Sequence, residues 1–440
     1  MKYEKLVIFI VFFVGLPFSI IKGIPLLYPL LLGLICFILT SLSSGFRLKD
    51  LISMMLKGTK RSLIVIKIFV LIGMITAVWR ACGTVAFIVY YGTAFINEQY
   101  FVLCAFLLCC LVSFLLGTSF GTVGTIGLIL MVLAKSGNVD PSVVAGAIIA
   151  GAYFGDRCSP MSSSAALVAT LTETSLYINI KNMFKTSIIP LALSIIGYIY
   201  LSQGHPLVFH DDRIGREILQ LFDLSMMVLL PALIILVAAV MKIDVKISMG
   251  LSIVAGILIA VFTQHQTLPE IMKYIMQGYS AASPGLFADI IKGGGLYSMI
   301  NVTLIVLISS AYSGIFEGTG FLKDIEHLFQ RISQRLGAYL ATMLTGTTAA
   351  AFSCNQTLAV MLTHQIGHKT YEKQGLNKYR LALDLENTVI MISALIPWNI
   401  AGAFPLAALS VDSGSLIYAL YLFMVPLTNI FTGKMRIAED

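Results

Sequence analysis

The sequence predicts an all-α polytopic membrane protein of about eleven or twelve transmembrane helices in two inverted repeats, with broken helices or re-entrant hairpins at the midplane. Three observations support this. Of the 440 residues, 58% are hydrophobic and only 12% are charged, whereas soluble domains carry about 25% charged residues. Apolar runs recur from end to end. The two halves contain similar segments whose flanking basic residues change sides.

The apolar runs have about the length that a helix needs to cross a hydrocarbon core of roughly 30 Å. The clearest lie at 6–21, 26–42, 62–78, 100–116, 187–201, 222–240, 247–262, 299–315 and 415–430. No small-residue cleavage site follows the first run, so we expect a transmembrane helix there rather than a signal peptide. The expected partner is the lipid bilayer. The modest net charge of +7 gives no basis for nucleic-acid binding.

Similar segments appear in both halves of the chain. LKDLISMMLKGTK at 48–60 aligns with LPEIMKYIMQGYS at 268–280, and GTSFGTVGT at 117–125 is similar to GTTAAAFSCNQT at 346–357. GAYFGDRCSPMSSSA has a counterpart in ENTVIMISALIPWNIAGA. We expect a first repeat over 1–205 with breaks at 117–125 and 155–164, a polar linker over 206–221, and a second repeat over 222–440 with breaks at 346–357 and 386–399.

Basic residues in the loops predict opposite orientations for the two halves. The loop at 45–62 carries five Lys and Arg residues and its counterpart at 265–282 carries one, whereas 135–141 carries one and its counterpart at 364–380 carries four. Because Lys and Arg favour the cytoplasmic side, the alternation predicts inverted repeats and a cytoplasmic N-terminus in the cytoplasmic (inner) membrane. Inverted repeats are typical of secondary transporters, which bind substrate near the midplane.

Asp156 and Arg157 are adjacent in GAYFGDRCSPMSSSA, within an apolar region. A carboxylate at membrane depth costs several kcal/mol unless it is paired, solvated or protonated. A carboxylate that binds either a proton or a cation couples two fluxes by competition, so Asp156 is the predicted transport carboxylate. The alternative is an ion pair with Arg157 that serves only the fold. Glu386 is predicted to tune the charge of the site, or else to be a membrane-edge residue near Arg380.

The predicted breaks also carry hydroxyl and amide oxygens. Irregular backbone at membrane depth is tolerated only where it is buried in protein or lines a watery cavity. Close helix packing by small residues is the alternative for 117–127. A sodium site is expected at Asp156, Ser159, Ser163, Asn355 and Asn387, and no cofactor is expected apart from transported Na⁺ and H⁺. The full set of candidate oxygen ligands and lining residues is Thr118, Ser119, Thr122, Ser159, Ser162, Ser163, Asn355, Gln356, Asn387, Thr388, Trp398 and Asn399.

Arg80 is a further charged residue within an apolar run, at 73–92, and no acidic residue lies near it in the sequence. Pairing with Glu317 of the other half is one hypothesis. The other is contact with a substrate carboxylate, which guanidinium binds in bidentate geometry.

Three stretches, GTSFGTVGTIGLILM, GAYFGDRCSPMSSSA and NQTLAV with LIPWNIAGAF, resemble the NhaC-type sodium/proton antiporters of the ion-transporter superfamily. The resemblance spans roughly residues 30–430. It implies a secondary-active antiporter, and by analogy a homodimer that moves one domain like an elevator. Ser163 and Asn387 stand where the family usually has aspartates. The superfamily also includes exchangers of organic acids and amino acids. The alternative is therefore a proton- or sodium-coupled carrier or exchanger of a small organic acid or amino acid, in which Arg80 contacts the substrate carboxylate.

An enzyme is not expected. Cys158 or a serine of 159–164 would need a base, and the histidines lie in loops or at span ends. His364 and His368 have the i, i+4 spacing of a zinc pair but lack the HExxH motif.

Overall fold

The computed structural model describes residues 18–19, 22, 24–25, 27–92, 98–207, 212–241, 243–281, 286–319 and 337–432. Within these ranges the chain is helical, and the described residues form no β-strand element. The predicted all-α class is confirmed. Most of the predicted span at 6–21 lies outside the described residues.

Each of the other predicted apolar runs falls on one or more helices. In chain order the described elements are α2 (Leu27–Ser43), α3 (Leu48–Ala81), α4 (Thr84–Gly92), α5 (Phe101–Leu116), α6 (Ser119–Thr122), η2 (Val123–Gly127), α7 (Leu128–Ser136), α8 (Pro141–Cys158), α9 (Ser163–Leu171), α10 (Leu176–Gly204), α11 (Asp212–Leu221), α12 (Leu230–Val240), α13 (Val245–Phe262), α14 (Leu268–Gln277), α15 (Leu286–Ile291), α16 (Ile300–Thr319), α18 (Ala338–Ser353), α19 (Gln356–Lys373), α20 (Lys378–Leu385), η5 (Glu386–Ile390), α21 (Met391–Ala394), α22 (Ile400–Ala408) and α23 (Leu420–Thr432), with short 3₁₀ turns between some of them.

Three described helical stretches are long and apolar enough to cross a bilayer, at Ser119–Ser136, Leu176–Gly204 and Leu296–Phe316, and two sharply bent helix pairs raise the number to five. Shorter apolar helices accompany them. The number of eleven or twelve spans stays a prediction.

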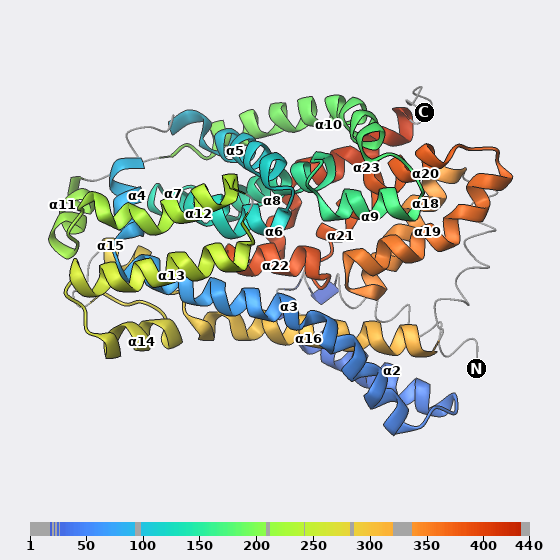
Figure 1. The fold of residues 1–440 in the computed structure, drawn as a ribbon, viewed down its shortest axis with the longest axis horizontal. Coiled ribbons are helices and arrows are strands. Elements are labelled where there is room, and N and C mark those ends of the chain that lie inside the picture. The colour runs from blue at the N-terminus through green and yellow to red at the C-terminus, as the bar shows by residue number, and fades with distance from the viewer. Residues whose placement is uncertain are drawn as a thin grey trace.

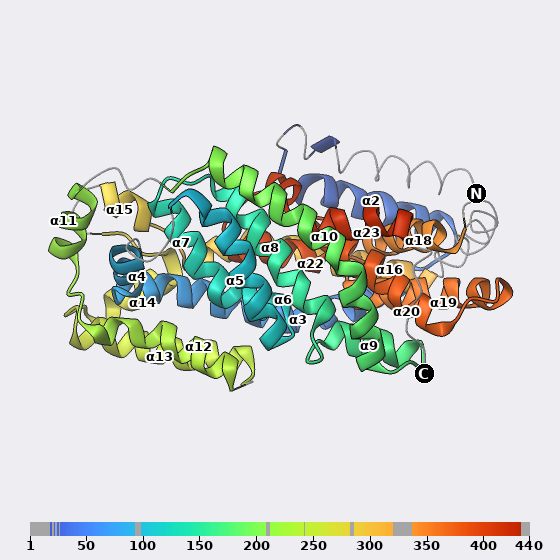
Figure 2. The ribbon, with the colours of Figure 1, turned by 90° about the horizontal axis from the view of Figure 1, so that it is seen from above.

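The helices form an elongated bundle (Figure 1). In both ribbon views α11 and α15 lie at one end and α18, α19 and α20 at the other, while α6, α8 and α22 occupy the middle (Figures 1 and 2). Helices α3 and α16 run side by side, and glycines permit their contact. A Cβ on Gly58 would lie 2.1 Å from the carbonyl oxygen of Ser310, and one on Gly314 would lie 2.1 Å from that of Met54.

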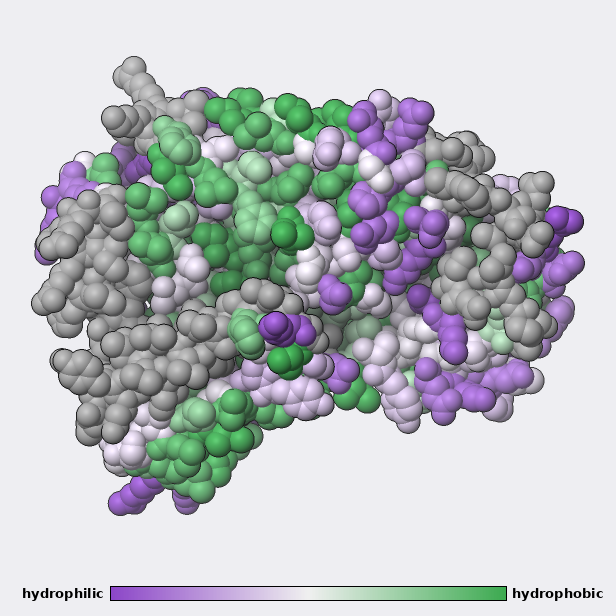
Figure 3. All heavy atoms as spheres, turned by 180° about the vertical axis from the view of Figure 1, so that it is seen from behind, coloured by the Kyte–Doolittle hydropathy of each residue, from purple (hydrophilic) through white to green (hydrophobic). Residues whose placement is uncertain are grey.

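Helix α10 exposes apolar side chains and buries polar ones. Ile188, Leu193 and Ile196 are exposed, whereas Asn182 and Ser187 are buried. This is the reverse of a helix on a water-soluble protein, whose polar face is outward. Figure 3 shows hydrophobic residues gathered over the upper and left part of one face and hydrophilic residues toward the right end. A multi-pass membrane protein therefore fits both the exposed surface and the apolar helices.

The segments predicted to repeat at 48–60 and 268–280 differ in the structure. Helix α3 continues through Gly58, whereas α14 ends at Gln277 and Gly278 follows with φ of 98°. The region predicted as a polar linker contains α11.

Candidate functional site

Two helix breaks in the middle of the bundle have the same backbone conformation. After α5, Gly117 is left-handed at φ 69° and Thr118 is extended at φ −146°, ψ 125°. After α18, Cys354 is left-handed at φ 52° and Asn355 is extended at φ −146°, ψ 126°. A left-handed residue ends a helix and lets the chain turn. The Thr118 and Asn355 side chains then cap the next helices, accepting hydrogen bonds from the N–H groups of residues 121 and 358.

A second pair of breaks is also matched. Helix α8 ends at Cys158, and Ser162 caps α9 by accepting a hydrogen bond from an N–H in its first turn. Helix α21 ends at Ala394, and Asn399 caps α22 in the same way. Ser162 and Asn399 are 237 positions apart in the sequence, as are Thr118 and Asn355. The two halves therefore repeat both breaks in the same register.

The four breaks surround a cavity of about 410 Å³, which we call the Asp156 cavity. Its lining consists of Thr118, Ser119, Phe120, Asp156, Ser163, Ser164, Leu167, Asn355, Gln356, Thr357, Val360, Ile390, Ile400 and Ala401. Ten of these residues form five pairs at the same spacing of 237: 118 with 355, 119 with 356, 120 with 357, 163 with 400, and 164 with 401. The cavity thus lies where the two repeated units meet, as a transporter site is expected to.

Asp156 is the charged residue among those that line the cavity. It lies in the last turn of α8 and is 5% exposed. The polar side chains of Ser119, Ser164 and Gln356 lie close to its carboxylate. Its main-chain carbonyl accepts hydrogen bonds from the hydroxyls of Ser162 and Ser164, which fix the turn into α9. Among the described residues, the polar side chains close to the carboxylate are therefore neutral.

Arg157 is buried and lies against different elements. Its guanidinium donates to Tyr421 of α23 at 3.1 Å, to Thr186 of α10 at 2.8 Å, and to Ser187. It also donates to Oδ1 of Asn387 in η5. Among the described residues Arg157 has no ion-pair partner, so the alternative of an Asp156–Arg157 ion pair is not what the structure contains.

The contact with Arg157 corrects the predicted role of Asn387. Its amide oxygen accepts from a guanidinium rather than facing the cavity. The predicted sodium set of five residues is therefore divided. Asp156, Ser163 and Asn355 line the cavity, but the Ser159 hydroxyl donates to the carbonyl of Phe114 at 2.7 Å.

Glu386 is fully buried in the π-helical turn η5. Neither of its carboxylate oxygens has a hydrogen-bond partner among the described residues. Arg157 attracts its negative charge and Asp156 repels it. Arg380 pairs instead with Asp384 at 3.0 Å, so Glu386 is not an edge residue bound to Arg380.

The other predicted side chains hold the breaks in shape. Thr122 and Thr388 donate back to carbonyls one turn earlier in their helices. Trp398 Nε1 donates to the carbonyl of Ala351 at 2.9 Å, and Asn399 Nδ2 to that of Ala350 at 2.7 Å. These bonds join the second-half break to α18, and none of these residues lines the cavity.

Arg80 lies apart from the predicted residues around the Asp156 cavity. It is in the last turn of α3, and its Nη1 donates to the carbonyl of Thr76 at 2.6 Å. It does not line the Asp156 cavity. The side chain of Glu317, its hypothetical partner, is outside the described residues.

Several lining residues were not predicted from the sequence: Ser164, Thr357 and the apolar side chains of Phe120, Leu167, Val360, Ile390, Ile400 and Ala401. The spacing of 237 would have found Ile400 from its predicted first-half counterpart, Ser163. The cavity offers one carboxylate with hydroxyl and amide oxygens, and the described residues hold no cluster of three His, Cys, Asp or Glu side chains.

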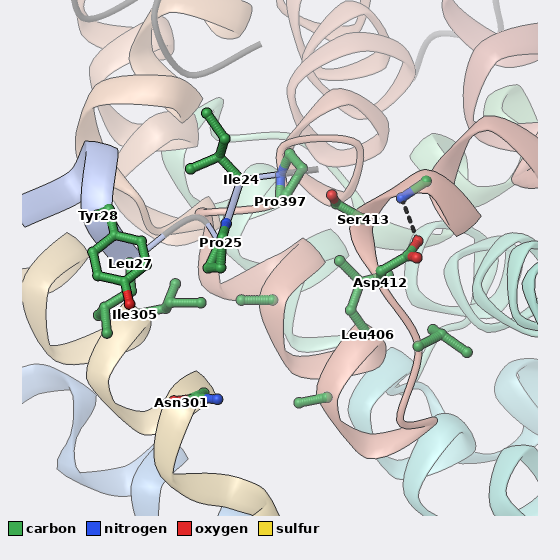
Figure 4. Close-up of a pocket in the computed structure, with 14 residues that line it drawn as sticks. Ile24, Pro25, Leu27, Tyr28, Asn301, Ile305, Pro397, Leu406, Asp412 and Ser413 are labelled. Carbon is green, nitrogen blue, oxygen red and sulfur yellow. Dashed lines mark hydrogen bonds between the residues drawn. The ribbon is translucent and has the colours of Figure 1, made fainter. Parts of the chain in front are cut away.

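A second cavity, of about 550 Å³, lies between α2, α16, α22 and the turn after α22. Figure 4 shows Tyr28, Asn301 and Leu406 around it, with Asp412 accepting a hydrogen bond from the N–H of Gly414. None of the predicted site residues lines it.

Comparison with known proteins decides the family. A family model described as the Na⁺/H⁺ antiporter family matches residues 5–202 and 151–435. The chain belongs to this family. The prediction of a secondary-active antiporter resembling the NhaC type is confirmed, and the chain is a membrane transporter.

Three relatives illustrate the range of the family. The Na⁺/H⁺ antiporter NhaC of Alkalihalophilus pseudofirmus is 28% identical over 88% of this chain and 85% of the relative. The malate-2H⁺/Na⁺-lactate antiporter of Bacillus subtilis is 26% identical over 95% and 92%. The arginine/ornithine antiporter ArcD of Halobacterium salinarum is 28% identical over 85% and 79%.

Proposed function

We propose that this chain exchanges protons for a cation by alternating access, and that the two compete for Asp156. The observation that carries this proposal is the position of Asp156. It is a buried carboxylate on a cavity formed by two repeated helix breaks, where secondary transporters bind their substrates.

The surroundings of Asp156 favour competition. Its polar neighbours Ser119, Ser164 and Gln356 are neutral, and the adjacent Arg157 is bound to other groups. A buried carboxylate requires a compensating charge, because electrostatic energies grow as the local dielectric constant falls. A proton or a cation supplies that charge, and the binding of one excludes the other.

Sodium is the first cation to test, because relatives of this chain are named as Na⁺/H⁺ antiporters. Hydroxyl and amide oxygens of Thr118, Ser163 and Asn355 stand around the cavity beside Asp156. Na⁺ and H⁺ are substrates in this proposal, and no cofactor takes part.

The cytoplasmic membrane is the proposed location, with the N-terminus in the cytoplasm. The alternating excess of Lys and Arg in the segments between the apolar runs supports this orientation. The family resemblance supports a homodimer with an elevator-like motion.

The test uses purified protein in proteoliposomes with an imposed pH gradient and a pH-sensitive dye. Adding sodium outside moves protons in the wild type, and Asp156→Asn abolishes that response. Asp244→Asn is the matched control, because Asp244 is an exposed helix cap and asparagine also caps helices. Wild-type rates in Asp156→Asn would overturn the proposal.

A second candidate function is exchange of a small organic acid or amino acid. The names of the malate/lactate and arginine/ornithine antiporters support it, and so does a cavity far larger than a single ion. Arg80 is not part of the cavity, so a substrate carboxylate there would bind through neutral groups.

A further inference from the structure

The repeat around the Asp156 cavity differs in chemistry where α9 of the first half corresponds to α22 of the second. Helix α9 contributes Ser163 and Ser164, whereas the equivalent positions of α22 hold Ile400 and Ala401. The carboxylate is likewise confined to the first half, because the position equivalent to Asp156 is Ser393, whose hydroxyl donates to the carbonyl of Val389. One side of the cavity is therefore polar and acidic, and α22 presents an apolar side.

The charge of the lining selects for cations. Asp156 is the charged residue among the lining residues. Arg157 is held by Tyr421, Thr186 and Asn387. An anionic ligand would meet a carboxylate without a compensating cation, whereas a cationic group would neutralise it.

The apolar side does not suit a bare metal ion. A dehydrated cation requires oxygen ligands all around it, as hard cations do in proteins. Val360, Ile390 and Ile400 add apolar side chains to the lining and offer no oxygen from those side chains. Pockets of about 300–1,000 Å³ with apolar walls and a few polar groups are typical sites for small organic molecules, and this cavity of about 410 Å³ is in that range.

We propose that the Asp156 cavity binds a small organic cation, with its ammonium or guanidinium group on Asp156 and its hydrocarbon part against Ile400 and Ala401. This inference rests on the proposed function, since it names the cation that competes with the proton. It makes Ile400 and Ala401 the residues that determine substrate specificity.

The experiment uses wild-type proteoliposomes and the pH dye, with L-lysine, L-arginine, sodium and malate as separate probes. We expect proton movement with lysine or arginine. Ile400→Ser, which restores the residue of the equivalent first-half position, is expected to lower the apparent affinity for that probe about tenfold, because buried hydrocarbon is lost. Ile400→Val keeps the apolar wall and is expected to retain affinity within about threefold.

Two controls separate specificity from folding. Ile188→Ser makes the same change on the exposed face of α10, away from the cavity. Ala401→Ser adds a single hydroxyl to the wall and serves if Ile400→Ser does not fold. We expect it to weaken binding of the organic cation, because the added hydroxyl makes the wall less apolar.

The outcomes distinguish this inference from the proposed function. A response to sodium with silence for lysine and arginine overturns the inference and leaves the proposed function intact. A response to malate alone overturns both, because both require a cation at Asp156. Equal affinity in Ile400→Ser and wild type overturns the role of the apolar wall.

Discussion

Arg157 donates a hydrogen bond to Oδ1 of Asn387, 230 positions further along the chain. This contact joins the end of α8 to η5, next to the buried Glu386. Arg157 also binds Thr186 and Tyr421, so its guanidinium ties together elements from both halves. Asn387 is therefore a partner of Arg157, and it is not among the residues that line the Asp156 cavity.

Replacing Asn387 tests that assignment. Asn387→Ala removes an acceptor from a buried guanidinium, which is expected to cost about 1–3 kcal/mol of stability. The thermal unfolding midpoint in detergent should fall, while the apparent affinity for the transported cation stays unchanged. A large loss of cation affinity with unchanged stability would return Asn387 to the cation site.

Close contact between α3 and α16 predicts a severe effect of small substitutions. Gly314→Ala places a methyl group 2.1 Å from the carbonyl oxygen of Met54, so the helices must separate, and folded protein should be lost. Gly250→Ala in α13 is the control, since nothing lies within 4 Å of its Cβ position; it is expected to be neutral or to stabilise by up to about 1 kcal/mol. Size-exclusion chromatography and thermal unfolding report both effects.

Three aromatic rings connect the cavity lining to α3. Phe404 stacks on Phe120 at 4.2 Å and on Phe69 at 5.7 Å between ring centroids. Phe404→Ala is expected to cost about 3–5 kcal/mol, as for other buried aromatic residues. Phe262→Ala, at a side chain that is 75% exposed, should have little effect. Equal unfolding temperatures for the two variants would show that the stack does not stabilise the fold.

The N-caps formed by Thr118 and Asn355 should contribute about equally to the stability of the fold. Thr118→Ala and Asn355→Ala each remove an N-cap acceptor, at an expected cost of about 0.5–2 kcal/mol. Asn355→Ser keeps an acceptor and should retain most of the stability. Thermal unfolding compares the three variants, and no difference between Asn355→Ala and Asn355→Ser would contradict the capping role.

The sequence was sufficient to predict the helices and the position of the cavity. Apolar runs determine which segments become helical in a membrane, and helix breakers beside polar residues marked the four breaks. All four predicted breaks were too wide, because the non-helical residues are only 117–118, 159–162, 354–355 and 395–399. Helix α18 instead continues to Ser353, and within it Thr345, Thr347 and Thr348 donate their hydroxyls to carbonyls four residues earlier.

Side-chain direction could not be predicted in the same way. Asp156 and Arg157 are adjacent, but neighbours on a helix diverge by about 100°. Asp156 therefore reaches the cavity while Arg157 reaches α10, η5 and α23, and that outcome depends on how distant helices pack. The apolar lining from α22 was missed for a related reason, since apolar residues on a buried helix give no signal that they face a cavity.

The central claim is competition between a proton and a cation for Asp156, and the pH dependence of the apparent KM tests it most directly. The initial rate of exchange is measured in proteoliposomes over a range of cation concentrations at several pH values. Competition predicts that the apparent KM rises by about tenfold for each unit of falling pH once protons occupy the site, with an unchanged maximal rate. An apparent KM that does not change with pH, with only the maximal rate falling, would contradict the account.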